Sequence, residues 1–295
     1  MSETEEESQG PLHSVDTYSG KLYWLNPPSG KTIDLESLKN DLQNRTFQED
    51  ITEDFEDEDI IVPSVFERDG QMVKTTTTED VKLVNYNGSN IITGKVVLDD
   101  VDRIVYRDQL IFVLDTTEAN FLVFKGNDFF YFCVLAKRKL ANTVVETFRD
   151  EFTELGSIIN QTRLGSGAIS DIGDRLDAVL MDTIIADYDQ NEITQTRIQG
   201  ESYEDTDVYD SIGSGGSVKS HLFQTDELVP DDTKTILIGR DGLVRIYSNA
   251  TLRTYLNLVK KYVIPEVHRD VESSPSVGAW EAVSNDSSDS IFTDI

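Results

Sequence analysis

The stretch Phe129-Phe130-Tyr131-Phe132-Cys133-Val134-Leu135 decides how the fold is predicted, because it is apolar at nearly every position. A strand with one face in water alternates apolar and polar residues, whereas a strand buried on both faces is a continuous apolar run. We therefore predict a central strand that is covered on both faces. Cys133 lies inside this run, which favours a buried structural thiol over a catalytic nucleophile.

The sequence before this central strand carries the signals of β-hairpins. Asn-Gly and Asp-Gly pairs supply the positive φ angles of tight turns, and they occur at Asn87-Gly88 and Asp69-Gly70. Gly126-Asn127-Asp128 turns the chain into the central strand itself. The strands expected here are Lys21–Leu25, Ile60–Val62, Met72–Val73, Val81–Tyr86, Asn90–Leu98, Arg103–Leu114 and Phe121–Phe124.

Helical periodicity appears between and after the strands. Apolar residues three or four positions apart predict a short helix with Leu35, Leu38 and Leu42 on one face and Asp34 near its start. They also predict amphipathic helices at Lys139–Ile159 and Ile169–Ala186. A last helix is expected after Asn249 as its cap, with Pro265 as its end. The strands expected in this half of the chain are Val218–Gln224, Thr235–Gly239 and Leu243–Tyr247, the last two joined by a turn at Asp241-Gly242.

These elements predict an α+β fold with a mostly antiparallel sheet of hairpins and amphipathic helices. A hairpin followed by a helix occurs twice, which raises the hypothesis of a duplicated hairpin–helix unit. The expected organisation is an acidic disordered N-terminus at 1–17, an α+β domain at 18–160, a helix with an acidic and glycine-rich linker at 161–217, a hairpin–helix lobe at 218–270, and a disordered acidic tail at 271–295.

The charge of the chain is strongly negative. The 295 residues include 55 acidic and 26 basic side chains, and the formal net charge is −29. This charge disfavours non-specific binding to nucleic acid or anionic lipid. Adaptation to high salt, mimicry of nucleic acid and an ordinary acidic protein remain as interpretations. A single cysteine rules out an internal disulfide, and no 18-residue apolar stretch predicts a membrane span, so we expect a cytoplasmic protein.

The segment 218–269 departs from the acidic average, since its basic residues slightly outnumber its acidic ones. We predict a basic face made of Arg245, Arg253, Lys260 and Lys261, which would bind a protein partner, the acidic segments of the same chain, or a nucleic acid strand. The acidic tail carries apolar residues that are typical of docking peptides. The candidate anchors are Trp280, Ile291 and Phe292.

We therefore favour a non-enzymatic interaction or regulatory protein that binds a macromolecular partner through the lobe and the tail, and we expect no cofactor. A homo-oligomer remains open. The alternative is a metal-dependent enzyme acting on phosphodiesters or nucleotides. That enzyme would need Asp174, Asp177 or Asp182 to converge in a concave pocket facing the basic lobe. A nucleic-acid mimic is the third hypothesis.

Overall fold

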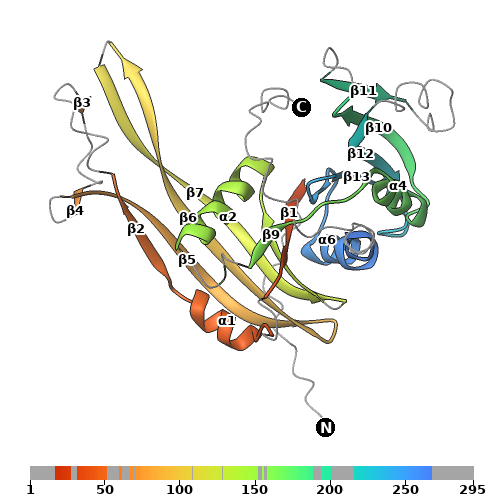
Figure 1. Ribbon diagram of the computed structural model, residues 1–295, viewed down its shortest axis with the longest axis horizontal. Coiled ribbons are helices and arrows are strands. Elements are labelled where there is room, and N and C mark those ends of the chain that lie inside the picture. Colours follow the sequence, from red (N-terminus) through yellow and green to blue (C-terminus); the bar gives the residue numbers. More distant parts are fainter. Residues whose placement is uncertain are drawn as a thin grey trace, which may run out of the picture.

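A computed structural model describes residues 17–27, 32–51, 60–61, 67–68, 71–107, 109–127, 129–151, 155, 158–188, 194–200 and 216–267. Its main feature is one large, mostly antiparallel sheet, whose strands follow the order β11-β10-β12-β13-β14-β1-β8-β7-β6-β5-β2 (Figure 1). The prediction of an α+β fold with a dominant antiparallel sheet is confirmed. Within the described ranges, no helix is long and apolar enough to cross a membrane.

The predicted central strand is confirmed as β8 (Phe129–Leu135), which lies between β1 (Tyr18–Leu25) and β7 (Gln109–Gly126). Tyr131 and Cys133 belong to one hydrophobic core, and Phe132 and Val134 belong to the other. Alternate residues of a strand point to opposite faces, so β8 supplies both cores at once. This double burial is the physical reason why the strand has no polar alternation.

Three long strands form a curved arm that extends beyond the helices in Figure 1. They are β5 (Gln71–Tyr86), β6 (Ser89–Tyr106) and β7, and the predicted turn at Asn87-Gly88 joins the first two with φ angles of 48° and 78°. The expected strand Arg103–Leu114 is wrong, because this range contains a second turn, at Arg107 (φ 51°). Ile60 and Ile61 form β3, which pairs in parallel with β7 and not with the strand at Met72.

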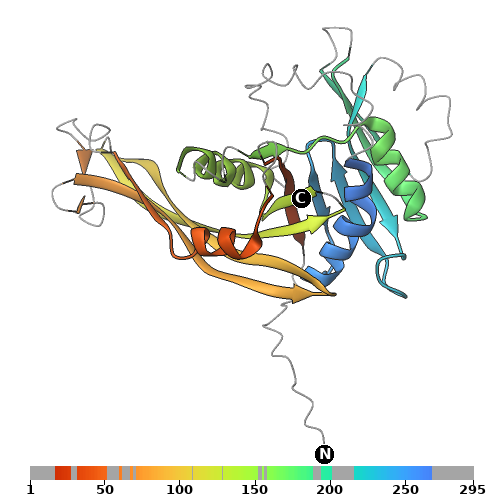
Figure 2. The ribbon, with the colours of Figure 1, turned by 60° about the horizontal axis from the view of Figure 1, so that its bottom comes forward.

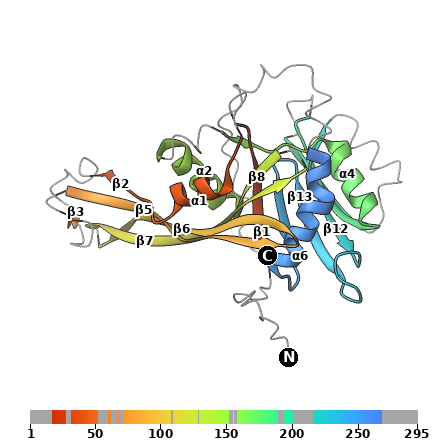
Figure 3. The same ribbon diagram turned by 90° about the horizontal axis from the view of Figure 1, so that it is seen from below.

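Helices cover both sides of the sheet. Helices α1 (Leu35–Leu42) and α2 (Arg138–Glu151) pack against one side, and Figure 3 shows both on the same side of the arm. Helices α4 (Ser166–Arg175) and α6 (Leu252–Leu258) pack on the other side, where Figure 2 shows them together. The two helices that follow hairpins, α2 and α6, therefore lie on opposite faces, and the duplicated unit stays a prediction.

The predicted helix at 169–186 is wrong in its second half. Helix α4 ends at Arg175, Asp177 has a φ of 44°, and Val179–Ala186 form strand β10. Three of its six apolar residues are β-branched, and the stretch pairs with strand β12 (Ser217–Thr225) on one edge and β11 (Gln195–Gln199) on the other. The acidic and glycine-rich linker that was expected after this helix, within 161–217, thus contains strand β11.

The hairpin of β13 (Lys234–Gly239) and β14 (Leu243–Ile246) is confirmed, and it belongs to the same sheet as the first half of the chain. Residues 18–21 of β1 pair with residues 243–246 of β14. A short strand, β9 (Ile159–Gln161), takes the rest of that edge of β1. The remaining strands are β2 (Thr46–Asp50) and β4 (Glu67–Arg68).

The final helix differs from its prediction at both ends. Thr251 caps it in place of Asn249, through a hydrogen bond from the Thr254 N–H to the Thr251 hydroxyl at 3.2 Å. Helix α6 continues as the π-helical segment η3 (Val259–Val263), and helical structure then runs through Pro265 to Val267. The helix predicted to reach Ile159 is shorter than expected, since Ile159 begins strand β9; helix α2 is described from Arg138 to Glu151.

Candidate functional site: the open half of the sheet beside helix α2

One half of the sheet carries no described helix on the side of α2. Helix α2 contacts β1, β7 and β8 on this side, while α4 and α6 pack on the opposite one. Paired residues of antiparallel strands point to the same side, so the register sets a row of side chains across β10, β12, β13, β14 and β1. This row, together with Lys219, is called the open face below; its members are Asp182, Leu222, Leu237, Arg245 and Ser19.

Arg245 and Tyr247 lie at one end of the open face. Arg245 Nε donates to the Ser19 hydroxyl at 3.3 Å, and its guanidinium lies 5.3 Å from the ring centroid of Tyr247. Tyr247 is 39% exposed, and the half-buried Leu222 and Leu237 lie beside it toward β10. A cation stacked on an exposed aromatic ring next to apolar side chains is typical of interaction surfaces.

Asp182 lies at the other end of the open face. Its Oδ2 accepts hydrogen bonds from Arg197 Nε at 2.7 Å and Gln199 Nε2 at 3.2 Å. Its Oδ1 is buried and accepts no hydrogen bond within the part of the chain that the structure describes. A buried acceptor of this kind can receive a donor from a bound partner.

Two cations stand at the edge of the open face near strand β11. Lys219 Nζ donates to Gln195 Oε1 at 3.4 Å, and Arg240 contacts both Asp187 and the Ser217 hydroxyl. The hydrogen bond from Arg240 lowers the pKa of Asp187 below its ordinary value. Arg240 therefore ties the β13–β14 turn to the residue that follows β10.

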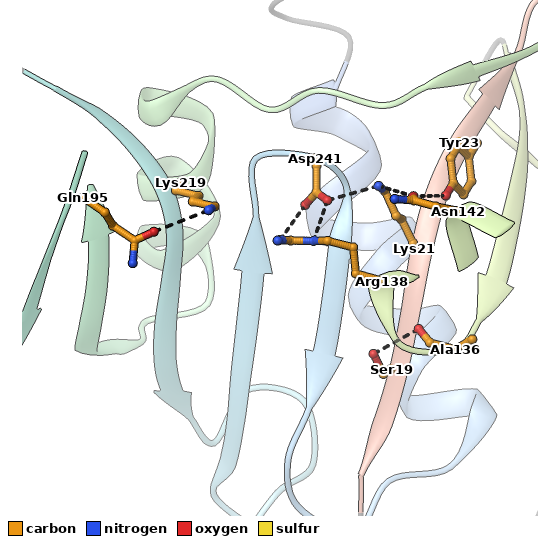
Figure 4. Close-up of polar contacts among 9 residues, drawn as sticks. All are labelled: Ser19, Lys21, Tyr23, Ala136, Arg138, Asn142, Gln195, Lys219 and Asp241. Atoms are coloured by element: carbon orange, nitrogen blue, oxygen red, sulfur yellow. Dashed lines mark hydrogen bonds and ion pairs between the residues drawn. The ribbon is translucent and has the colours of Figure 1, made fainter. Parts of the chain in front are cut away.

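A charged network around the buried Lys21, with the half-buried Asp241 and Arg138, joins the open face to helix α2 (Figure 4). Lys21 of β1 lies 3.1 Å from Asp241 Oδ2 and donates to Asn142 Oδ1 at 2.7 Å. Arg138, at the start of α2, places its Nε 2.9 Å from the same Asp241 oxygen. The Tyr23 hydroxyl donates to Asn142 Oδ1 at 3.0 Å. The network thus fixes the first turn of α2 against β1 and the β13–β14 turn.

Burial and charge act in opposite directions inside this network. Burial lowers the pKa of Lys21, and Asp241 opposes that change. Burial alone would raise the pKa of Asp241, but Arg138 and Lys21 outweigh it, so the pKa of this carboxyl lies below its ordinary value. Asp241 is therefore ionised between its two cations at neutral pH.

The open face and the charged residues that border it, called its rim, carry a net positive charge, opposite in sign to that of the whole chain. Cations outnumber carboxylates two to one here, although the whole chain has a net charge of −29. Arg245 and Lys219 have no carboxylate within 4 Å among the described residues. The cations are Lys21, Arg138, Arg197, Lys219, Arg240 and Arg245, and the carboxylates are Asp182, Asp187 and Asp241.

The structure separates the four residues of the predicted basic face. Arg245 points to the open face, because its neighbours Val244 and Ile246 point into the core under α6. Arg253 is exposed on α6, Lys260 lies 5.7 Å from the ring centroid of Phe124, and Lys261 Nζ donates to the Tyr262 hydroxyl at 2.7 Å. All three belong to the helix on the opposite side of the sheet, so the single face is not formed.

The partner-binding role of these four residues stays a prediction. The three tail candidates, Trp280, Ile291 and Phe292, lie outside the described residues.

The three aspartates of the enzyme hypothesis do not converge. Asp174 belongs to α4 and Asp177 follows it, whereas Asp182 points to the open face on the other side of the sheet and pairs with Arg197. Over the described ranges, no group of three or more His, Cys, Asp or Glu side chains could hold a metal ion.

Cys133 and His221 have side chains of the kinds most often used as nucleophile and base, and both are buried. Burial raises the pKa of the Cys133 thiol to about 12. Burial likewise lowers the pKa of His221 to about 4, and its Nδ1 lies 2.7 Å from the Thr183 hydroxyl. At neutral pH the first is a protonated thiol and the second is a neutral imidazole, both within the core.

Sequence reasoning missed the network, although one signal was visible. Lys137-Arg138-Lys139 places three cations at the start of a helix, where the helix dipole favours negative charge. Such an unfavourable placement indicates that the cations have another role. Asp241 was assigned only to a turn, since nothing in the sequence relates it to Lys21 or Arg138. The chain matches no known family model and no curated protein.

Proposed function

We propose that the protein is a non-enzymatic interaction protein whose open face binds an acidic segment of a partner protein. The observation that carries the proposal is the excess of cations over carboxylates on this face and its rim, in a chain that is acidic overall. Complementary charge fixes the orientation and selects the partner.

Apolar side chains supply the contact area for such a segment. Leu222 and Leu237 form the centre of the surface, and at its end Arg245 stands over the ring of Tyr247. Aromatic and arginine side chains dominate the binding energy of many interfaces. The ligand we propose is therefore a peptide segment that combines carboxylates with one or two apolar residues.

The net charge of −29 would repel an acidic partner at long range. Screening limits this repulsion to about 8 Å at physiological ionic strength and to about 3 Å at 1 M salt. At shorter distances the local positive charge of the open face then dominates the interaction with the acidic segment. We retain adaptation to high salt as part of the proposal, because a high-salt environment would keep this long-range repulsion screened at all times.

The proposal is tested with a fluorescent peptide rich in Glu that also carries Leu and Phe, with binding followed by anisotropy. The double variant Arg245→Gln, Lys219→Gln should lose binding. The control, Lys82→Gln with Lys125→Gln, makes the same change in net charge at exposed sites away from the open face. Equal loss in both variants would reject the open face as the site.

Two further probes separate the hypotheses. The same peptide with Gln in place of Glu should bind weakly, because it lacks the carboxylates. A single-stranded DNA oligonucleotide that binds more tightly than the acidic peptide, and that depends on Arg245, would favour nucleic acid recognition and reject a protein partner.

A further inference from the structure

A cavity of about 370 Å³ lies between helix α2 and the strands β2, β5, β6 and β7. It is separate from the open face, because helix α2 forms one of its walls and lies between the cavity and the β13–β14 turn. Phe47, Leu98 and Leu140 supply its apolar surface, and threonines from the strands and the helix supply hydroxyls. A volume of this size is within the range of sites that bind small ligands or a few side chains of a peptide.

The carboxylates that line the cavity already have donors. Glu49 pairs with Lys74 at 2.7 Å. Asp99 accepts from the Thr75 N–H at 3.1 Å and the Thr116 hydroxyl at 3.2 Å. Asp100 accepts from the Val101 N–H at 2.8 Å.

The cations on the helix wall are in a different position. Lys137 and Lys139 are exposed, and neither has a carboxylate within 4 Å among the described residues. They stand at the N-terminal end of α2, where the helix dipole adds positive potential. The cavity therefore presents two available ammonium groups above an apolar surface, which fits a ligand that carries carboxylates beside bulky apolar groups.

We infer that the segment Asp289–Ile295 of the same chain binds in this cavity. Its apolar pair Ile291-Phe292 stands between Asp289 and Asp294, and the chain from residue 271 onward contains no basic residue. The lining as a whole carries three lysines and three carboxylates, so the match in charge is with the exposed lysines of the helix wall. The apolar pair of the segment matches the apolar surface of the cavity. The acidic run Glu49–Asp59 begins in the cavity wall itself, and Glu3–Glu7 contains no apolar residue.

The length of chain permits this contact. Ile291 is 24 residues beyond Val267, the last described residue of the final helix. A chain of that length spans up to about 80 Å when extended. Attachment also gives the segment an effective concentration of about a millimolar or more, so a weak intrinsic affinity is enough for occupancy.

The test is paramagnetic broadening in the full-length chain labelled at Ser287→Cys with a nitroxide. Cys133 will not take the label, because it is fully buried with a raised pKa. We expect broadening at the methyl groups of Leu98 and Leu140. Ile291→Ala with Phe292→Ala should abolish it, and so should Lys137→Gln with Lys139→Gln. Lys82→Gln with Lys125→Gln is the charge-matched control and should leave it unchanged.

Three results would overturn the inference. They are broadening centred on Leu222 and Leu237, broadening that is absent from both places, and broadening that the Lys137 and Lys139 substitutions do not affect. Mixing nitroxide-labelled chains with isotope-labelled chains that carry no nitroxide must give no broadening, since a signal there means that a second copy supplies the segment. None of these results alters the binding of an acidic peptide to the open face, so the two proposals fail separately.

Discussion

At the scale of single residues, Asp241 holds two cations that come from β1 and from α2. Removing one member of a buried ion pair leaves the other charge buried without compensation. We expect Asp241→Asn to lower the free energy of unfolding by about 3 kcal/mol, measured by urea denaturation at pH 7. Asp80→Asn breaks an exposed pair with Lys82 and should cost less than about 1 kcal/mol. Equal losses would contradict the role of Asp241 in compensating the charge of the buried Lys21.

The acid dependence of the same residue follows from the direction of its pKa. Asp241 has a lower pKa in the folded protein than in the unfolded chain, so the unfolded chain binds its proton first as the pH falls. Its contribution to stability is complete above the ordinary value of 3.8 and is lost as the pH falls through the folded pKa. The difference in unfolding free energy between the native protein and Asp241→Asn should therefore shrink below about pH 4.

His221 gives a second pH-dependent prediction in a higher range. Its pKa is about 4 in the fold against 6.5 for the free side chain, so the unfolded chain binds more protons between these values. Stability should fall by about 3 kcal/mol from this residue as the pH drops from 7 to 4. Histidine NMR should show a neutral ring down to about pH 4. A ring that becomes charged near pH 6.5 without loss of stability would refute the buried neutral imidazole.

At the scale of elements, Arg175 stabilises the final helix at its proline. Pro265 has no N–H, so it cannot donate to the Lys261 carbonyl one turn earlier. Arg175 Nη2 donates to that carbonyl at 2.6 Å, and its Nη1 lies 2.7 Å from the buried carboxylate of Glu266. Because the Arg175 side chain is 39% exposed, we expect Arg175→Met to cost about 2 kcal/mol, less than a fully buried pair.

A double-mutant cycle separates the two contacts of Arg175. Pro265→Ala restores an N–H for the Lys261 carbonyl, so Arg175→Met should cost about 1 kcal/mol less in that background. The remaining cost belongs to the loss of the ion pair between Arg175 and the buried carboxylate of Glu266. If the cost of Arg175→Met is the same with and without Pro265, the carbonyl contact contributes nothing to stability.

Element prediction succeeded where one local pattern dominates. The apolar run of β8 and the Asn87-Gly88 turn each admit one structure, and both were predicted from sequence. Prediction failed at Val179–Ala186, where the apolar residues fit the helical period and the strand equally. The pairing of β10 with β11 and β12 decides the outcome, and those partners lie well beyond residue 186.

The site was harder to predict than the fold, for a physical reason. Arg245 and Lys260 are close in sequence, but strand alternation sends Arg245 to one side of the sheet, while Lys260 lies on a helix packed against the other. The charge of a segment therefore does not give the charge of a surface. The network of Lys21, Arg138 and Asp241 depends on strand order, which local sequence patterns do not contain.

At the scale of the whole molecule, the net charge of −29 makes stability depend on salt. Repulsion between surface carboxylates acts over about 10 Å at 0.1 M salt and about 3 Å at 1 M. We expect the urea midpoint to rise as KCl increases from 0.1 to 2 M, and unfolding below about 1 M salt would indicate halophilic adaptation. A midpoint that stays constant over this range would assign the carboxylates to an ordinary acidic surface.

The position of β1 in the sheet has a consequence for synthesis on the ribosome. This strand is synthesised before every other described strand, yet its neighbours are β8 and β14, and the latter ends at Ile246. One edge of β1 can pair with β8 once residue 135 has emerged. On the other edge, residues 18–21 can pair with β14 only after residues 243–246 have emerged. The nascent chain therefore carries an incomplete sheet until residue 246 has emerged, which is a state prone to wrong pairing. The β1–β14 pairing, which joins the two halves of the sheet, forms only after the strands on both sides have been made.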